Sequence, residues 1–388
     1  MCGICGIAPF DGTRPVESAA LRRMAGSMVH RGPDSDGFHH EPGIGLGIRR
    51  LSIIDLVTGD QPISSEDGTV TVVCNGELYN FTELRHELLA SGHRFRTESD
   101  AEVLIHRYED YGDEFLQRLR GMFGLALWDR RHRTLLLARD RFGIKPLHYT
   151  LHKDALYFAS EQKPILAAAG IERNLDFPAL RDLFSFGFVT GSKTLFRDIR
   201  RLPPGHYLVF KEGKLTIRQY WQVNFPERQS FKSLSAGEWG EALLEKLEES
   251  VRLHLRSDVP VGAWLSSGID SSGIASLMCR MTDRPVQTFS IAFENADFDE
   301  VTRQRTLNDF PDYRISNQRV VCRSGDFNLL PKALWHVEDL STSGIEIPRM
   351  MLSELSARKV KVVLTGEGAD EIFGGYGWFH ADKYLRPL

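Results

Sequence analysis

The sequence predicts two different folds in series, an α+β half followed by an α/β half. In the first half, short β-rich runs at 123–129, 134–138 and 156–159 are separated by charged turns, which is typical of antiparallel sheets. In the second half, an apolar run at 259–264 precedes a hydroxyl-rich turn, and another at 360–364 precedes an acidic, glycine-rich turn. We expect these two runs to be parallel strands of an open α/β sheet, in which ligands bind where such turns cluster.

Size and composition exclude several classes of protein. The 388 residues are enough for two or three domains, and 42% hydrophobic with 26% charged residues is ordinary for a globular protein. The net charge of −4 argues against nucleic acid as a partner, and no apolar run approaches the length of a membrane span. The N-terminus lacks the pattern of a secretory signal, and five scattered cysteines suit a reducing compartment. We therefore expect a cytoplasmic protein.

A polar stretch with little periodicity divides the chain. Residues 224–237 have the composition of a linker, so we expect a first domain at 1–223 and a second at 238–388. The first should contain helices at 80–89 and 101–111. The second should begin with an amphipathic helix, because apolar residues recur there every four positions: Trp239, Leu243, Leu247, Val251 and Leu255.

The second residue of the chain is a cysteine, and a small residue there allows the initiator Met1 to be removed. Cys2 would then carry a thiol and a free α-amine, whose ordinary pKa is about 7.7–8.0. The amine can accept the proton of its own thiol, so Cys2 is a candidate nucleophile. Cys2 and Cys5 could instead form half of a zinc site or a redox pair, but no second Cys-x-x-Cys or His pair follows. A merely buried cysteine is the other alternative.

The turn at 265–272 joins the run at 259–264 to a helix that we expect to start at Gly273. Such a turn collects unpaired backbone N–H groups and the positive end of a helix dipole, which together favour anions such as phosphate. Asp270 would not suit an anion unless a divalent cation lay between them. A capping turn without a ligand is the alternative.

Two segments of the second half resemble the asparagine synthetases. Ser266 to Ser271 is similar to the Ser-Gly-Gly-x-Asp-Ser pyrophosphate loop of ATP pyrophosphatases, which implies that the loop grips the pyrophosphate of ATP and that Asp270 holds Mg²⁺. Ser267 replaces the first loop glycine and would be strained if that position needs a positive φ, although its hydroxyl could instead serve a phosphate oxygen.

The acidic turn at 366–371 resembles the same family through its Gly-Glu-Gly-x-Asp-Glu pattern. The resemblance implies that Glu367 takes a proton from attacking ammonia and that Asp370 joins Asp270 at Mg²⁺. A solvated acidic loop or a chance cation site is the alternative.

The first half resembles the class II glutamine amidotransferases, which are N-terminal nucleophile hydrolases. The resemblance implies an αββα sandwich of antiparallel sheets, with Cys2 as the nucleophile. A sixth matching segment, at 139–147, we expect to be structural. The five matching segments that carry function, in order, are the Cys2 terminus, the pocket loop 30–34, the strand 49–55, the oxyanion segment 72–80 and the acidic element 99–102.

Residues in these segments suit the steps of acyl transfer from glutamine. The Asn75 amide and the Gly76 backbone N–H can donate to the tetrahedral oxyanion. Arg50 can bind the α-carboxylate of glutamine, while Glu77 and Asp100 can pair with its α-ammonium. Taken singly, Asn75-Gly76 could be a hairpin turn and Arg50 could be half of a surface ion pair.

Over nearly its whole length the chain is similar to the glutamine-hydrolysing asparagine synthetases of the B type. The resemblance implies that ammonia from glutamine passes through a channel to an ATP-activated carboxylate, with aspartate giving asparagine, AMP and pyrophosphate. Glutamine, ATP, aspartate and Mg²⁺ are the implied ligands, and a homodimer is left open. The residues assigned to ATP and pyrophosphate are Leu265, Ser266, Ser267, Gly268, Asp270, Ser271, Ile291, Thr365 and Gly366.

The match is weak at 294–345, and the family continues after Gly374-Gly375-Tyr376 through a helical segment whose lysine has no counterpart here. We therefore expect a fragment or an incomplete second domain. Two rival functions follow from these departures. The same machinery could act on another carboxylate in a natural-product or polysaccharide pathway, or the protein could only hydrolyse or bind glutamine.

Overall fold

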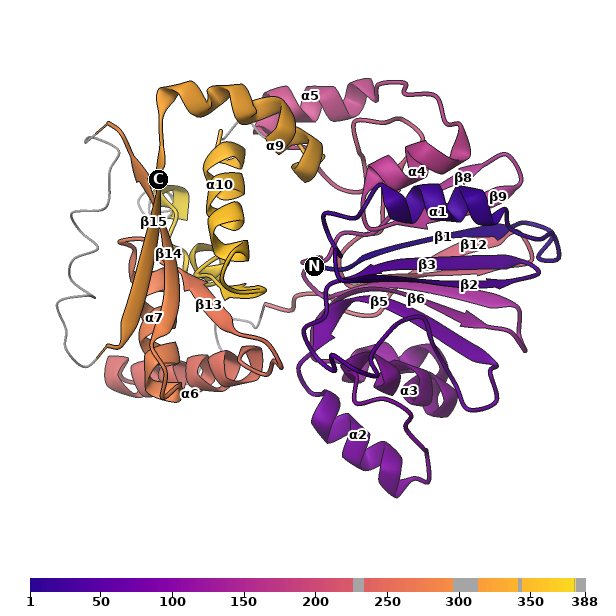
Figure 1. Ribbon diagram of the computed structural model, residues 1–388, viewed down its shortest axis with the longest axis horizontal. Helices are drawn as coiled ribbons and strands as arrows, with labels where there is room; N and C mark the ends of the chain where they lie inside the picture. Colours follow the sequence, from indigo (N-terminus) through magenta and orange to yellow (C-terminus); the bar gives the residue numbers. More distant parts are fainter. Residues whose placement is uncertain (226–233, 296–312, 341–343, 380, 382–388) are drawn as a thin grey trace. The chain divides into compact units, whose positions relative to one another are not determined.

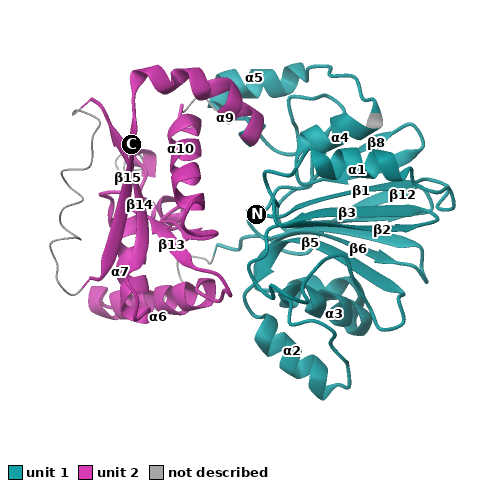
Figure 2. Cartoon of the chain, viewed as in Figure 1, with its two compact units in different colours: residues 1–232, 337–343 teal, residues 233–336, 344–388 magenta. Residues whose placement is uncertain are grey.

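The computed structural model describes residues 1–225, 234–295, 313–340, 344–379 and 381. The chain forms two compact units, one of residues 1–232 with 337–343 and the other of residues 233–336 with 344–388 (Figure 2). The polar stretch at 224–237 and the weakly matching region at 294–345 lie partly outside the described residues.

Two six-stranded sheets form the centre of the first unit, and every strand pair in them is antiparallel (Figure 1). The first sheet has the order β10-β8-β9-β1-β3-β2, and its strands are β1 (Gly3–Pro9), β2 (Ser35–Glu41), β3 (Ile44–Arg50), β8 (His148–His152), β9 (Ala155–Ala159) and β10 (Arg200–Arg201). The second has the order β12-β11-β7-β6-β5-β4, and its strands are β4 (Ile63–Ser64), β5 (Val70–Leu78), β6 (Gly121–Asp129), β7 (Thr134–Arg139), β11 (His206–Lys211) and β12 (Lys214–Gln219).

Helices cover the outer face of each sheet, which gives four layers (Figure 1). One core packs α1 (Ser18–Gly26) and α4 (Gln162–Ala169) on the first sheet, a second fills the space between the sheets, and a third packs α2 (Phe81–Ala90) and α3 (Val103–Tyr111) on the second sheet. The short helices η1 (Asp100–Glu102) and η2 (Gly112–Arg118) flank α3. This αββα sandwich confirms the fold expected for the first half.

The second unit is built on a parallel sheet of four described strands, ordered β15-β14-β13-β16. The strands are β13 (Val261–Trp264), β14 (Val286–Phe293), β15 (Ile315–Cys322) and β16 (Val362–Leu364). α6 (Ala236–His254) and α7 (Ile269–Met281) pack on one face, and α10 (Glu346–Ala357) packs on the other. The α/β fold expected for the second half is therefore confirmed.

The remaining helices are α5 (Phe177–Phe186), η5 (Ser324–Leu329), α9 (Leu330–Val337) and α11 (Ala369–Phe373). The expected amphipathic helix is α6, which starts at a capping box formed by Ser235 and Glu238 and buries Val251 in the core. Among the described residues, no helix has the length and apolar character needed to cross a membrane.

Candidate active sites

Cys2 lies immediately before β1, where antiparallel pairing sets Gly3 opposite Arg49 of β3. This register brings the Cys2 sulfur to Leu51, whose backbone N–H donates to Sγ at 3.4 Å, while Sγ donates to the Leu51 carbonyl at 3.7 Å. Burial raises the pKa of the thiol, and the neighbouring amino terminus and Lys145 oppose that rise. Because Met1 precedes Cys2 here, the nitrogen of Cys2 is a peptide nitrogen rather than an amine.

The predicted pocket loop at 30–34 is fastened to this terminus through Arg31. Its Nε donates to the Cys2 carbonyl at 2.9 Å, and its Nη1 donates to Glu161 at 3.0 Å. Glu161 also accepts from Lys163 and lies 3.0 Å from His30. The backbone at Cys2 is therefore held by a buried cluster of charges.

Asn75 lies within β5, paired with Gly124 of β6. The hairpin turn considered for Asn75-Gly76 is therefore wrong. Asn75 has no exposed surface, and neither Oδ1 nor Nδ2 of its amide has a hydrogen-bond partner in the described part of the chain. A buried amide without partners is costly, so its donor is available for a ligand.

Gly76 continues β5 where the two strands come unusually close. A Cβ at this position would lie 2.3 Å from the Met122 carbonyl oxygen and 2.7 Å from the Phe123 Cα. Both are backbone atoms that cannot turn aside, so only glycine fits. The glycine in the predicted oxyanion segment is thus required by packing as well as by any approach of substrate.

Two acidic side chains near the end of β5 have raised pKa values. Burial raises the pKa of Glu77 to about 8, and the nearby charge of Asp100 adds to the effect. Burial also raises the pKa of Asp100 to about 6, although the Leu78 N–H donates to its carboxylate at 2.8 Å. Buried carboxylates in this state favour a cationic ligand, which would stabilise their charged forms.

Arg50 is 5% exposed at the end of β3 and is already held by three hydrogen bonds. Nη1 donates to Asp60 at 2.9 Å, and Nη2 donates to the carbonyls of Ile54 at 3.1 Å and Asp55 at 2.6 Å. Asp60 is largely exposed, but the backbone carbonyls of Ile54 and Asp55 also hold the guanidinium in position. A simple surface ion pair does not describe this arrangement.

Lys145 is a member of this cluster that sequence reasoning had assigned only to a structural segment. It is 5% exposed, its Nζ lies 3.1 Å from the Met1 sulfur, and burial lowers the pKa of its ammonium while Glu77 opposes that change. No short motif could reveal that Lys145 lies beside the N-terminus, because the two segments meet only when both sheets have folded.

In the second unit, the turns after β13 and β16 line one cavity of about 390 Å³. It contains nearly all the residues assigned to nucleotide and metal: Leu265, Ser266, Gly268, Asp270, Ser271, Ile291, Thr365, Gly366, Glu367 and Asp370. Ser267 belongs to the same turn but is not part of the lining. The two turns meet at Gly366, where a Cβ would lie 2.8 Å from both the Asp270 Cβ and the Ser271 nitrogen.

The turn after β13 is organised by its serines. The Ser266 and Ser271 hydroxyls lie 2.9 Å apart, and the Ser266 hydroxyl accepts from the Gly268 N–H at 3.1 Å. Gly268 has a φ of −70° and caps α7, which begins at Ile269, four residues before the expected start. Ser267 is not among the residues with positive φ, so its replacement of a family glycine costs no backbone strain.

Asp270 and Asp370 offer carboxylate oxygens to the same cavity, beside the hydroxyls of Ser266 and Ser271. Within the described residues, no side chain pairs with either carboxylate. Hard oxygen donors of this kind fit Mg²⁺, which prefers one or two carboxylates plus phosphate and water. The residues present therefore fit a magnesium nucleotide.

Glu367 lines the cavity but is paired. Arg349 of α10 donates to its Oε1 at 2.7 Å, and both side chains are substantially exposed. Arg349 is a cavity residue that sequence reasoning missed, since its only signal was a basic residue beside Pro348 in a helix. The pair places a cation next to the predicted ammonia-facing carboxylate.

Comparisons with known proteins agree with the two-unit structure. Residues 1–221 match the family described as glutamine amidotransferase domain, and residues 242–387 match the family described as asparagine synthase. A Bacillus subtilis protein named asparagine synthetase [glutamine-hydrolyzing] 1 is 40% identical over 393 residues, covering 100% of this chain and 61% of that protein.

Two further relatives cover the whole chain. A Mycobacterium tuberculosis protein named putative asparagine synthetase [glutamine-hydrolyzing] is 35% identical and is covered to 62% of its length. A Gibberella zeae protein named amidase chry2 is 34% identical and is covered to 61%. The chain thus spans about three-fifths of the length of these relatives.

Proposed function

The chain belongs to the glutamine amidotransferase family, and we propose that its first unit hydrolyses glutamine with Cys2 as the nucleophile after removal of Met1. The observation that carries this proposal is the buried amide of Asn75, which has no hydrogen-bond partner among the residues that the structure describes. Cys74 and Glu77 flank Asn75-Gly76 in β5, and the charge of each interacts with that of Cys2. A buried amide donor that has no partner within the described part of the chain suits the stabilisation of an oxyanion.

Glutamine itself is bound through its two charged ends in this proposal. The α-ammonium pairs with Asp100 and Glu77, whose pKa values are raised by burial and whose charged forms a cationic group would stabilise. The α-carboxylate takes the N–H donors of Arg50 that Asp60, Ile54 and Asp55 leave unused. Arg31 and Glu161 keep the Cys2 backbone in place while the thiol reacts.

The proposed role of the second unit is to activate a carboxylate with ATP so that ammonia can displace AMP. The Ser266–Ser271 turn holds the pyrophosphate, Asp270 and Asp370 hold Mg²⁺, and Glu367 accepts a proton from the attacking ammonia. When bound, Mg²⁺ neutralises the charge that develops on the phosphates. Aspartate is the proposed acceptor, because relatives that match the whole chain are named asparagine synthetases.

A different acceptor is the second candidate, and one observation favours it. Relatives of similar identity over the same length are named amidases rather than synthetases. The weakly matching region 294–345, in which we expect acceptor contacts, lies partly outside the described residues. The channel for ammonia, the cytoplasmic location and the homodimer stay predictions.

Three assays on purified protein test the proposal together. Glutamine hydrolysis that disappears in Cys2→Ala supports the first unit's role. Aspartate-dependent release of pyrophosphate supports aspartate as acceptor, and ammonium should replace glutamine in the Cys2→Ala protein. Intact glutaminase activity without aspartate-dependent pyrophosphate would reject asparagine synthesis and favour another acceptor or a glutaminase alone.

A further inference from the structure

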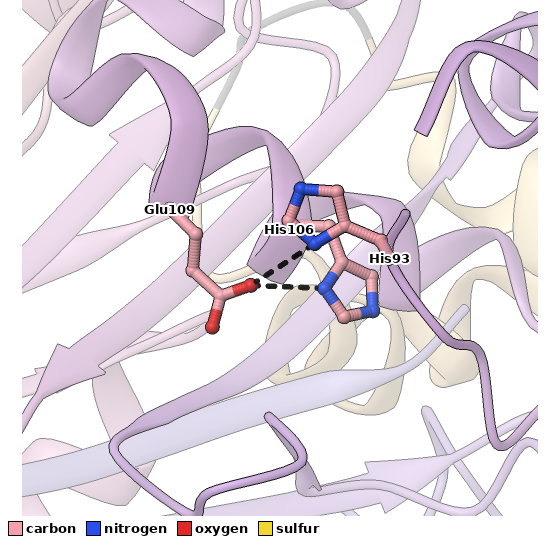
Figure 3. Close-up of side chains that lie close together, drawn as sticks. All are labelled: His93, His106 and Glu109. Carbon is pink, nitrogen blue, oxygen red and sulfur yellow. Dashed lines mark hydrogen bonds and ion pairs between the residues drawn. The ribbon is translucent and has the colours of Figure 1, made fainter. Parts of the chain in front are cut away.

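A group of potential metal ligands lies in the first unit, apart from all residues assigned above. His93 follows α2, while His106 and Glu109 are three residues apart on α3 (Figure 3). One ligand atom from each of the three lies within 4.8 Å of the others. Glu109 Oε2 is the centre of the group, at 2.9 Å from His106 Nδ1 and 3.6 Å from His93 Nδ1.

The chemistry and spacing of these atoms suit zinc. Zn²⁺ is commonly bound by imidazole nitrogen and carboxylate oxygen at about 2.0–2.2 Å, so tetrahedral ligand atoms lie about 3.3 Å apart. The distances from Glu109 Oε2 to His106 Nδ1 and to His93 Nδ1, 2.9 and 3.6 Å, lie on either side of that value. The nitrogens of His93 and His106 lie within 4.8 Å of each other, so the two rings would move toward one another for the three atoms to bind one ion, with a water as the fourth ligand.

Carboxylates behind both histidines provide a second, independent observation. Asp110 Oδ1 lies 2.9 Å from Nε2 of His93, and Glu102 Oε1 lies 3.9 Å from Nε2 of His106. The His106 side chain is 2% exposed, and its Nε2 has no hydrogen-bond partner within the part of the chain that the structure describes. Histidines that bind metals usually direct their other ring nitrogen to a carboxylate, which orients the ring.

Glu102, whose Oε1 lies 3.9 Å from His106 Nε2, is itself held in place by hydrogen bonds. Its carboxylate accepts from the backbone N–H groups of Arg96 at 2.8 Å and Thr97 at 2.7 Å, and from the Thr97 hydroxyl. These bonds join the segment after His93 to the start of α3. A metal at the cluster would tie the same two segments together a second time.

We propose that His93, His106 and Glu109 form a Zn²⁺ site that fastens the segment between α2 and η1 to α3. The ion links the two ends of the chain segment that contains Asp100, the residue proposed to bind the glutamine ammonium. The zinc has no part in the acyl transfer itself, because none of its ligands belongs to the Cys2 cluster.

The test is a zinc titration of the full chain after removal of metal with a chelator, using competition with a chromophoric chelator to obtain affinity and stoichiometry. We expect one Zn²⁺ per chain. His93→Ala and Glu109→Gln should each weaken binding at least about tenfold, since each removes one of three protein ligands. Asp110→Asn, which removes only an outer carboxylate, should weaken it by a smaller factor.

Two controls separate this site from others. His86→Ala removes an exposed histidine of α2 outside the cluster and should leave the affinity unchanged. The titration is repeated in Cys2→Ala, because a reactive thiol also binds zinc, and the same single site should remain. Circular dichroism verifies that each variant is folded. The proposal is overturned if the folded wild-type chain takes up no zinc from a tenfold excess, or if His93→Ala and Glu109→Gln bind zinc like the wild type.

Discussion

The two candidate sites differ in the burial and the protein partners of their charged side chains. Around Cys2, charged side chains are buried and already bonded to protein, as Arg50 is to Asp60 and Arg31 is to Glu161. In the cavity of the second unit, Asp270 and Asp370 face open space without a protein partner among the described residues, and Glu367 is largely exposed. The Cys2 site is therefore preorganised by protein contacts before its ligand binds. The carboxylates of the cavity in the second unit are instead solvated until a ligand binds.

This difference has a physical reason. A thiol that attacks an amide needs donors in fixed positions where the oxyanion forms, and water in the site would weaken them. A magnesium nucleotide brings its own charges and waters, so exposed carboxylates suffice until it binds. Substitutions in the first site should therefore affect the chemical step, and those in the second should affect binding of metal and nucleotide.

The largest expected effect is the loss of one activity without the other. Cys2→Ala should lower glutamine hydrolysis by at least about 10⁴-fold, because the nucleophile is lost. Pyrophosphate release supported by ammonium should stay within twofold of wild type. Both rates are measured on one preparation. Comparable loss of the ammonium-supported rate would mean that the two sites do not act independently.

Asn75→Ala should lower glutaminase kcat by about 10²–10³-fold, since one oxyanion donor is removed. The free energy of unfolding should change by no more than about 1 kcal/mol, because the amide has no protein partner to lose. Steady-state kinetics and urea denaturation measure the two quantities. Asn80→Ala, which removes an amide bonded to Arg118 and Arg120, serves as the matched control that should leave kcat unchanged.

In the second site, Asp270→Asn should lower ATP-dependent pyrophosphate release about 10²-fold and raise the Mg²⁺ concentration needed for half-maximal rate. Asp283→Asn, an exposed carboxylate after α7, is the control. Glutaminase activity should be the same in both variants. An Asp270→Asn protein with a normal magnesium dependence would remove this residue from the metal site.

Lys145→Met should slow alkylation of Cys2 about tenfold at pH 7, which corresponds to a rise of about one unit in the thiol pKa. The sign follows from the charge, because the Lys145 ammonium favours the thiolate and thus lowers the Cys2 pKa. The rate-against-pH profile should shift to higher pH, whereas Lys214→Met on exposed β12 should leave it in place. If the profile of alkylation rate against pH is unshifted in both variants, Lys145 does not lower the Cys2 pKa and its role is structural.

The smallest effect concerns the turn at Ser267. Because this residue has no positive φ and does not line the cavity, Ser267→Gly should change pyrophosphate release less than threefold. The added backbone freedom should cost about 0.5–1 kcal/mol of stability at most. A large gain in activity would show that the serine had been obstructing phosphate after all.

Local patterns in the sequence were enough to predict antiparallel strands in the first half, parallel strands in the second half and several individual elements, whereas the αββα layering was implied by the family resemblance. The β-rich and apolar runs predicted β6, β7, β9, β13 and β16, because these patterns depend on neighbours along the chain. The start of α7 was placed four residues late, since Ser266 to Ser272 looks like an extended turn until Gly268 is seen to cap the helix. Similarly, Ser99 caps η1 ahead of α3, which shortens the expected α-helix at its start.

Contacts between distant segments could not be predicted. Lys145 meets the N-terminus and Arg349 meets Glu367 only because strands and helices far apart in sequence pack together. His93 and His106 lie in a stretch without any metal-binding motif, and only the fold brings them to one point. Asn75 could be assigned by resemblance, but the lack of protein partners for its amide is visible only in the structure.

The central claim is that the thiol of a chain starting at Cys2 forms the bond to the glutamine carbonyl. Treatment with a diazoketone analogue of glutamine, followed by intact mass and peptide mass spectrometry, tests it directly. We expect one adduct per chain, on Cys2 of molecules that lack Met1, with glutamine protecting against labelling. An adduct on another residue, or full activity in molecules that retain Met1, would contradict it.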